Sequence, residues 1–203
     1  TTWSDGVHSI EDMIQEAEDQ QYTYFGITDH GETMGMTEGL SKEDIEAQAE
    51  EIAEIQNKYK DLTILQGLEV DIHEDGTFKH PKEGYQKLDF IVGSIHSHLE
   101  LNSESQTQRI IEAFESGVID IFAHPTSRYI NKRNPIEFDI DEIFQSAQKN
   151  QIAIECNANP KRLDLNDIHL KHLKKYDVPI AINSDAHSMK EIGNMKFGIN
   201  QAR

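Results

Sequence analysis

Six apolar segments of this chain each end in side chains that can bind a metal ion through oxygen or nitrogen. They are residues 22–30, 62–72, 88–97, 118–126, 151–159 and 178–187. Five lead to histidines and acids, and the sixth leads to two asparagines: His30, Glu69, His96, His124, Asp185 with His187, and Asn157 with Asn159. Ligands at the carboxyl ends of successive strands are what a (β/α) barrel needs to build a site at one mouth. The histidines and acids therefore predict a multinuclear centre without thiolate ligands.

The same segments predict an α/β fold. Each is a continuous apolar run, which is typical of parallel strands buried beneath helices. Helix start signals fall between the segments: Ser9 with Asp12, Ser41 with Asp44 (opening 42–60), Ser103 with Gln106, and Asp139 with Glu142. We also expect helices over 165–176 and 188–193, a loop over 1–6, and a lead-in to a further segment over 197–203. Strands that alternate with helices over 203 residues predict one α/β domain.

The charge of the chain restricts its partners. With 37 acidic and 19 basic side chains, the formal net charge is −18. This balance excludes a domain that grips nucleic acid unaided through a broad basic face. An anionic substrate would need bound cations, a local basic patch or a separate basic domain, and a carboxylate-rich mouth attracts divalent cations.

Two loops supply local positive charge. Arg128, Lys132 and Arg133 follow segment 118–126, and Lys161 and Arg162 follow segment 151–159. Both loops should lie at the mouth that carries the ligands. They either contact substrate phosphates, with Arg128 and Arg162 as the best candidates because arginine suits bidentate contacts, or they carry solvated charge.

The composition gives little sign of a membrane or an oxidising compartment. No stretch approaches the ~18–20 apolar residues of a membrane span. The single cysteine, Cys156, lies inside an apolar run and excludes a disulfide within one chain. We therefore expect a cytoplasmic protein with no membrane partner.

Several candidate residues have two interpretations. Asp5 is either a ligand or a turn residue, because Ser-Asp-Gly is a common turn composition. His98 competes with His96 for the same role, and we favour His96. Asn157 and Asn159 either hydrogen-bond a ligand or form a turn before Pro160. The remaining histidines are expected at the surface: His8, His73, His80, His169 and His172.

The motifs together resemble the PHP domain, the polymerase and histidinol phosphatase superfamily. The matching motifs, in order, are TTWSDG (1–6), ITDH (27–30), GLEVDI (67–72), SIHS (94–97), AHPT (123–126), NANPKRLDL (157–165) and SDAH (184–187). The chain is most similar to the C-terminal PHP domain of bacterial family X DNA polymerases. The resemblance implies a distorted seven-stranded (β/α) barrel with two to three divalent ions at its mouth.

The resemblance also implies a ligand set. Glu69 matches a bridging carboxylate, and the second metal is completed by His96 and His124. A third metal is held by Asp5, His30 and His187. Asp185 matches a ligand of the first metal, whose other ligands are a His-x-His pair that ends the first strand, just before residues 1–6. Residues 1–203 thus resemble an N-terminally truncated PHP domain that lacks its first strand.

The function implied by the resemblance is metal-dependent phosphodiester hydrolysis in DNA repair. Glu69, Asp185 and His187 would be catalytic, with manganese or zinc as the metal and iron or cobalt as options. The expected activity is a 3′–5′ exonuclease with DNA 3′-end or abasic-site processing, acting on 3′ ends or on nicked or gapped DNA. A polymerase domain would be linked upstream, and the truncated domain would be impaired or inactive.

Two other functions remain open from the sequence. One is a stand-alone small-molecule phosphatase of the histidinol-phosphatase type. The other is a non-catalytic PHP module that supports a polymerase.

Overall fold

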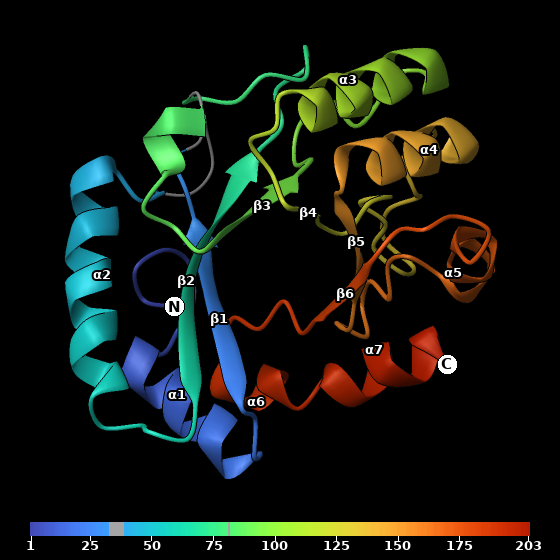
Figure 1. Ribbon diagram of the computed structural model, residues 1–203. Helices are drawn as coiled ribbons and strands as arrows, with labels where there is room; N and C mark the ends of the chain where they lie inside the picture. Colours follow the sequence, from blue (N-terminus) through green and yellow to red (C-terminus); the bar gives the residue numbers. More distant parts are fainter. Residues whose placement is uncertain (33–38, 81) are drawn as a thin grey trace.

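A single sheet of six parallel strands organises the chain (Figure 1). The computed structural model describes residues 1–32, 39–80 and 82–203. The strands pair in the order of the sequence: β1 (Tyr24–His30), β2 (Thr63–Asp71), β3 (Phe90–Ser94), β4 (Ile121–Phe122), β5 (Ala153–Asn157) and β6 (Ile180–Asn183). All six lie within the apolar segments singled out in the sequence, so the predicted α/β class is confirmed.

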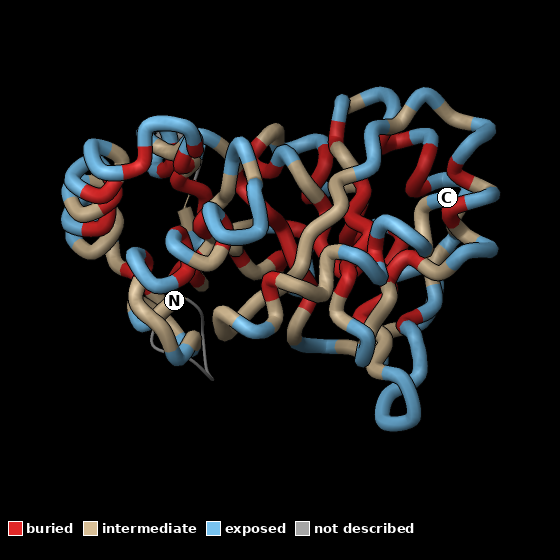
Figure 2. The backbone as a smooth tube through the Cα atoms, turned by 90° about the horizontal axis from the view of Figure 1, so that it is seen from below, coloured by how far each residue is buried: buried red, intermediate tan, exposed pale blue. Residues whose placement is uncertain are grey.

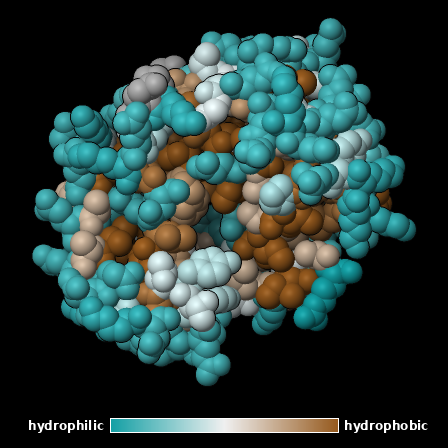
Figure 3. Space-filling view, in the orientation of Figure 1, coloured by the Kyte–Doolittle hydropathy of each residue, from teal (hydrophilic) through white to brown (hydrophobic). Residues whose placement is uncertain are grey.

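The sheet curls into a half-barrel whose two edge strands are β1 and β6 (Figure 1). Within the described residues these two strands do not pair with each other. A cavity of about 810 Å³ lies inside the curl and is lined by residues of both edges, including Gly26, Thr28, Ala181 and Asn183. Figure 3 shows the hollow near the middle of this face, with apolar side chains around it. The inner face of the sheet is therefore accessible between β1 and β6.

Helices form the outer layer (Figures 1 and 2). They are α1 (Ile10–Asp19), α2 (Lys42–Gln56), the 3-10 helix η1 (Lys82–Tyr85), α3 (Ser103–Glu115), α4 (Ile140–Asn150), α5 (Asp167–Leu173), α6 (Met189–Ile192) and α7 (Met195–Ala202). In the part of the chain that is described, none of these helices has the length and apolar character needed to cross a membrane.

The helix start signals are confirmed in three of four cases. Ser9 and Ser41 each form a capping box with the aspartate three residues on, and Asp139 accepts hydrogen bonds from the first turn of α4. In the fourth case the helix cap lies one residue before the predicted Ser103. Asn102 is the cap, because its Oδ1 accepts from Ser105 N at 2.9 Å. Gln106 instead is buried and donates to His98 O.

The expected lead-in over 197–203 overlaps a helix, α7 (Met195–Ala202), which packs against β5 and β6. Gly198 permits this packing, since a Cβ there would lie 2.7 Å from side-chain atoms of Ala158 and Ile182. Two other helices are shorter than expected: the 42–60 helix ends at Gln56, and the 165–176 helix spans Asp167–Leu173.

The core lies between the sheet and the helices (Figure 2). The smaller of its two clusters joins α1 and α2 to β1 and β2. The larger one packs α3, α4 and α5 against the remaining strands. At its centre, Phe122 of β4 is fully buried, and its ring centroid lies 5.4 Å from that of Phe114 in α3.

We predict that Phe122→Ala lowers the free energy of unfolding by about 3–5 kcal/mol, because it removes a buried ring and leaves a cavity. Phe197→Ala is the matched control, since Phe197 in α7 is 37% exposed. Urea denaturation of metal-free protein measures both changes. Equal losses for the two variants would contradict this description of the core.

Candidate metal centre

Strand register brings the predicted ligands together at one end of the sheet. In the parallel pairing of β1 with β2, His30 lies directly opposite Glu69. His96 and His124 follow the ends of β3 and β4, and the segment after β6 carries Asp185 and His187. In a parallel sheet all these strand ends meet at the same edge, as the sequence pattern predicts.

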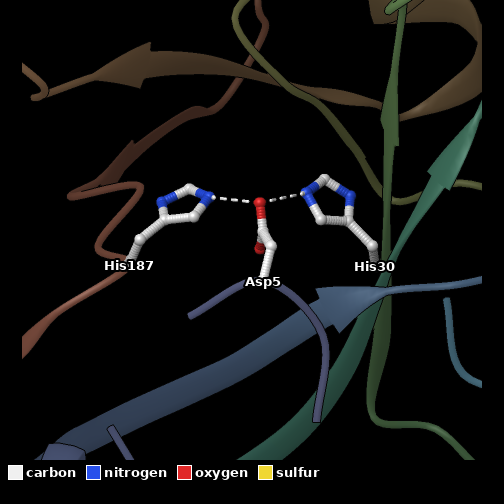
Figure 4. A group of neighbouring side chains, drawn as sticks. All are labelled: Asp5, His30 and His187. Carbon is white, nitrogen blue, oxygen red and sulfur yellow. Dashed lines mark ion pairs between the residues drawn. The ribbon is translucent and has the colours of Figure 1, made fainter. Parts of the chain in front are cut away.

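The first group of ligands consists of Asp5, His30 and His187 (Figure 4). Asp5 Oδ2 lies 3.4 Å from His187 Nε2 and 3.9 Å from His30 Nε2. The three ligand atoms all lie within 4.8 Å of one another. Val7 N donates to His187 O at 2.9 Å, which ties the loop of Asp5 to the segment after β6. Asp5 thus lies within reach of both histidines, as the ligand interpretation requires, and it also lies in a turn.

The second group surrounds Glu69. Its Oε1 lies 3.3 Å from His124 Nε2 and 3.5 Å from His96 Nε2, while its Oε2 lies 3.9 Å from His30 Nδ1. A carboxylate with imidazoles at both oxygens fits a bridging ligand between two cations. His30 approaches both groups through different nitrogens. Because a neutral imidazole has one lone pair for a metal, His30 can complete only one of them.

The electrostatics of Glu69 suit a cation site. Burial raises the pKa of the Glu69 carboxyl, but the hydrogen bond to His124 and the charges of His30 and His96 outweigh burial, and the net pKa falls well below the usual value. Glu69 is therefore ionised, which is the form that binds metal.

Asp71 orients His96. Its Oδ1 lies 2.6 Å from His96 Nδ1, so the other ring nitrogen is directed toward Glu69. Burial lowers the pKa of His96, yet the hydrogen bond to Asp71 and the charge of Glu69 outweigh it and the net pKa is raised. A carboxylate behind a histidine ligand is a common second layer of metal sites. Asp71 lies two residues after Glu69, and this spacing places both side chains on one face of β2.

The choice of His96 over His98 agrees with the structure. His98 lies at the rim, where its Nδ1 is 3.5 Å from Glu74 Oε2, and its side chain is 48% exposed. The five histidines expected at the surface are half-buried rather than exposed. Within the described residues, none of those five belongs to either group of ligands.

Asp185 is held by neighbouring donors. Its Oδ2 accepts from Asn157 Nδ2 at 3.1 Å and lies 3.3 Å from Arg162 Nε. Its Oδ1 lies 3.8 Å from His187 Nδ1. Asn157 Oδ1 accepts from Asn159 N at 2.9 Å, so the two asparagines form a turn that also positions Asp185.

Glu155 is a buried residue that the sequence analysis missed. It lines the cavity and accepts from His124 N at 2.5 Å and from Asn183 Nδ2 at 2.8 Å. Burial, together with the charge of Asp185, raises the pKa of Glu155 to about 8. Its acidic side chain inside the apolar run of β5 was the signal available in the sequence. Glu155 fixes the backbone from which His124 projects.

The basic loops differ in what their arginines contact. Arg162 lies beside Asp185, and its Nη1 is buried without a hydrogen-bond partner in the part of the chain that the structure describes. Arg128 instead donates from Nε to Arg162 O at 2.7 Å and from Nη2 to Leu163 O. Lys132 and Arg133 are exposed. Arg162 is thus the basic side chain of these loops that borders the ligand groups.

We predict that the single histidine variants fall into two pairs, and that the two variants of a pair lose the same metal ion. If Asp5, His30 and His187 hold one ion, His30→Ala and His187→Ala should lose the same ion. His96→Ala and His124→Ala should lose the other. Isothermal titration with Mn²⁺ or Zn²⁺, with bound metal measured after dialysis, checks the pairing. His98→Ala is the control and should bind like the parent chain, whereas His30→Ala behaving like His96→Ala would contradict the grouping.

We predict that Asp71→Asn lowers the affinity for the ion next to His96 by about 10–100-fold, because it removes the carboxylate that orients the His96 ring. The ion next to His187 should keep its affinity. The same titration resolves the two effects. Asp75→Asn is a suitable control, since Asp75 contacts Thr77 in an exposed turn. Equal weakening of both ions would instead indicate a general loss of structure.

Comparisons with known proteins identify the family and the fold. A family model described as the PHP domain matches residues 1–159. The chain is 37% identical over all 203 residues to DNA polymerase/3'-5' exonuclease PolX of Bacillus subtilis (strain 168), and it spans only 36% of that protein's length. It is 28% identical over 200 residues to a probable phosphatase of Caldicellulosiruptor bescii, covering 94% of this chain and 78% of that protein.

A solved structure shares the fold. Histidinol phosphate phosphatase (HISK) from Lactococcus lactis, in complex with zinc, L-histidinol and phosphate, matches with a TM-score of 0.72. The match covers 100% of this chain and 90% of that one at 19% sequence identity. The family model covers most of the chain, and the chain therefore belongs to the PHP domain family of phosphoesterases.

Proposed function

We propose that this chain is a metal-dependent phosphodiesterase domain that processes DNA 3′ ends. The observation that carries the proposal is the Glu69 carboxylate, which is approached by three imidazoles at the strand ends, with Arg162 close by. The carboxylates can hold cations, and the guanidinium can hold an anion. Clustered divalent ions, when bound, supply activation of water and neutralisation of charge on phosphate oxygens.

The donor set fits such ions. We propose that one ion is held by Asp5, His30 and His187, and a second by Glu69, His96 and His124. Asp185 with Glu69 would hold a third, together with the His-x-His pair that the family resemblance expects upstream. Imidazole and carboxylate ligands without thiolate suit manganese or zinc, with iron and cobalt as further options.

We propose that Arg162 contacts the phosphate that is hydrolysed. Asp185 lies against its Nε side, while Nη1 is buried and has no hydrogen-bond partner among the described residues. Such an unpaired donor is costly unless a ligand accepts from it. Arginine suits this role because its fixed fork matches phosphate oxygens. Asn157 and Asn159 support substrate binding by positioning Asp185.

A DNA substrate is supported by the similarity to PolX, which extends over the whole chain at 37% identity. We therefore propose 3′–5′ exonuclease activity, with 3′-end or abasic-site processing in repair, and a polymerase domain in the same polypeptide. The charge of −18 means that DNA must be held by bound ions and by the basic loops.

A second candidate is a small-molecule phosphatase. It is favoured by the fold shared with histidinol phosphate phosphatase and by relatives described as probable phosphatases. A non-catalytic module that supports a polymerase is the third possibility. The two clusters of candidate ligands in the described residues favour catalysis over that third reading.

We predict that, with Mn²⁺, the protein shortens a 5′-labelled oligonucleotide from its 3′ end. His124→Ala and Asp185→Ala should abolish the activity while circular dichroism shows a retained fold, because each removes a proposed ligand. His98→Ala is the control at the rim. The assay is run on this chain and on a version that includes the sequence upstream of residue 1.

The same samples distinguish the candidates. Release of phosphate from histidinol phosphate, with intact DNA, would favour the small-molecule phosphatase. Metal binding without hydrolysis of either substrate in the longer version would favour the non-catalytic module.

A further inference from the structure

The loop after β4 donates hydrogen bonds to the loop that carries Arg162. We call residues 127–134 the clamp loop and residues 158–165 the arginine loop. Three consecutive carbonyl oxygens of the arginine loop accept hydrogen bonds from the clamp loop. Ile130 N donates to Lys161 O at 2.7 Å, Arg128 Nε donates to Arg162 O at 2.7 Å, and Arg128 Nη2 donates to Leu163 O. Arg128 thus makes two of the three contacts.

The clamp loop also contacts the side chain of Arg162. The Arg162 guanidinium carbon lies 6.0 Å from the centroid of the Tyr129 ring, within the range of a cation–π contact. On its other side, Arg162 Nε lies 3.3 Å from Asp185 Oδ2. The backbone of Arg162 is therefore fixed by Arg128, and its guanidinium lies between Tyr129 and Asp185.

We propose that Arg128 is a positioning residue that acts through Arg162, and that it does not contact the substrate. This inference rests on the proposed role of Arg162 at the phosphate. The Nε and Nη2 of Arg128 already donate to protein carbonyls, whereas the Nη1 of Arg162 has no partner within residues 1–32, 39–80 and 82–203. Of the two arginines that the sequence offered as candidate phosphate contacts, only Arg162 then keeps that role.

The arginine loop has a physical need for this support. Leu163 has a φ of +46°, a left-handed conformation that costs a residue other than glycine roughly 1–3 kcal/mol and persists only where the surroundings hold it. The fork of Arg128 donates to the carbonyls of Arg162 and Leu163, which lie on the two sides of the Leu163 Cα atom. A lysine could keep the charge but could not reproduce two donors at a fixed spacing.

The direct test is the NMR signal of the Arg162 Nε–H group in protein with ¹⁵N-labelled arginine, assigned through Arg162→Lys. In the parent chain we expect one slowly exchanging signal for Arg162. Arg128→Ala and Arg128→Lys should both broaden it or shift it to the position of a solvated arginine. Lys149→Ala removes one positive charge from a side chain that pairs with Glu115 rather than with either loop, and it should leave the signal unchanged. An unchanged signal in Arg128→Ala would overturn the inference.

This readout needs no catalytic activity, so it separates the positioning role from the proposed function. If the parent protein hydrolysed no phosphoester, that result would count against the proposed function. The Arg162 signal would still test whether Arg128 positions Arg162. Thermal unfolding and Zn²⁺ titration of Arg128→Ala show whether the fold and the metal groups persist, and we expect both to be retained.

A double-mutant cycle adds a kinetic test. With bis-p-nitrophenyl phosphate, Arg128→Ala should lower kcat by about 10–100-fold, because a displacement of about 1 Å at a reacting group can cost 100-fold. Arg128→Ala combined with Arg162→Ala should be no slower than Arg162→Ala alone, since the first acts through the second. Losses that multiply, or restoration of kcat by Arg128→Lys, would instead show that Arg128 contacts the substrate.

Discussion

The buried charge of Glu69 is the constraint on which the rest of the site depends. An ionised carboxylate inside a protein costs several kcal/mol unless nearby charges and hydrogen bonds compensate for it. Here the compensation comes from His30, His96 and His124, contributed by the ends of three neighbouring strands. Asp71 then orients His96, and Glu155 fixes the backbone of His124. The site is therefore held by the sheet and by a second layer of carboxylates behind the histidines.

The strands, and the gathering of candidate ligands from their ends at one edge, could be predicted because both follow from local patterns. A parallel sheet places the carboxyl ends of its strands at one edge, so a ligand after each apolar run is enough to indicate a shared centre. The chemistry of these ligands then excludes thiolate sites and favours hard or borderline divalent ions.

The second layer could not be predicted, because it depends on contacts between distant residues. Glu155 is recognisable as unusual in an apolar strand, yet only the fold shows that it accepts from His124 N. The contact of Arg128 with the carbonyl of Arg162 spans 34 residues and involves no sequence motif of its own. The cap of α3 was predicted one residue too late because Asn102 and Ser103 are both good capping residues.

The similarity to a DNA polymerase and the negative charge of the chain point to opposite conclusions about a DNA substrate. Similarity to PolX favours a DNA strand, while the charge of −18 repels one. Both are satisfied only if cations at the centre, together with the arginine and clamp loops, offset the surrounding acids locally. If the substrate is DNA, as we propose, the metal centre would serve binding as well as hydrolysis.

Anomalous X-ray diffraction at the zinc edge, from crystals of this chain grown with zinc, tests the centre most directly. The account predicts separate peaks about 2.0–2.2 Å from the Nε2 atoms of His96 and His124 with an oxygen of Glu69, and from Asp5 with His187. Peaks confined to other surface residues, with Glu69 left in contact only with its histidines, would contradict it.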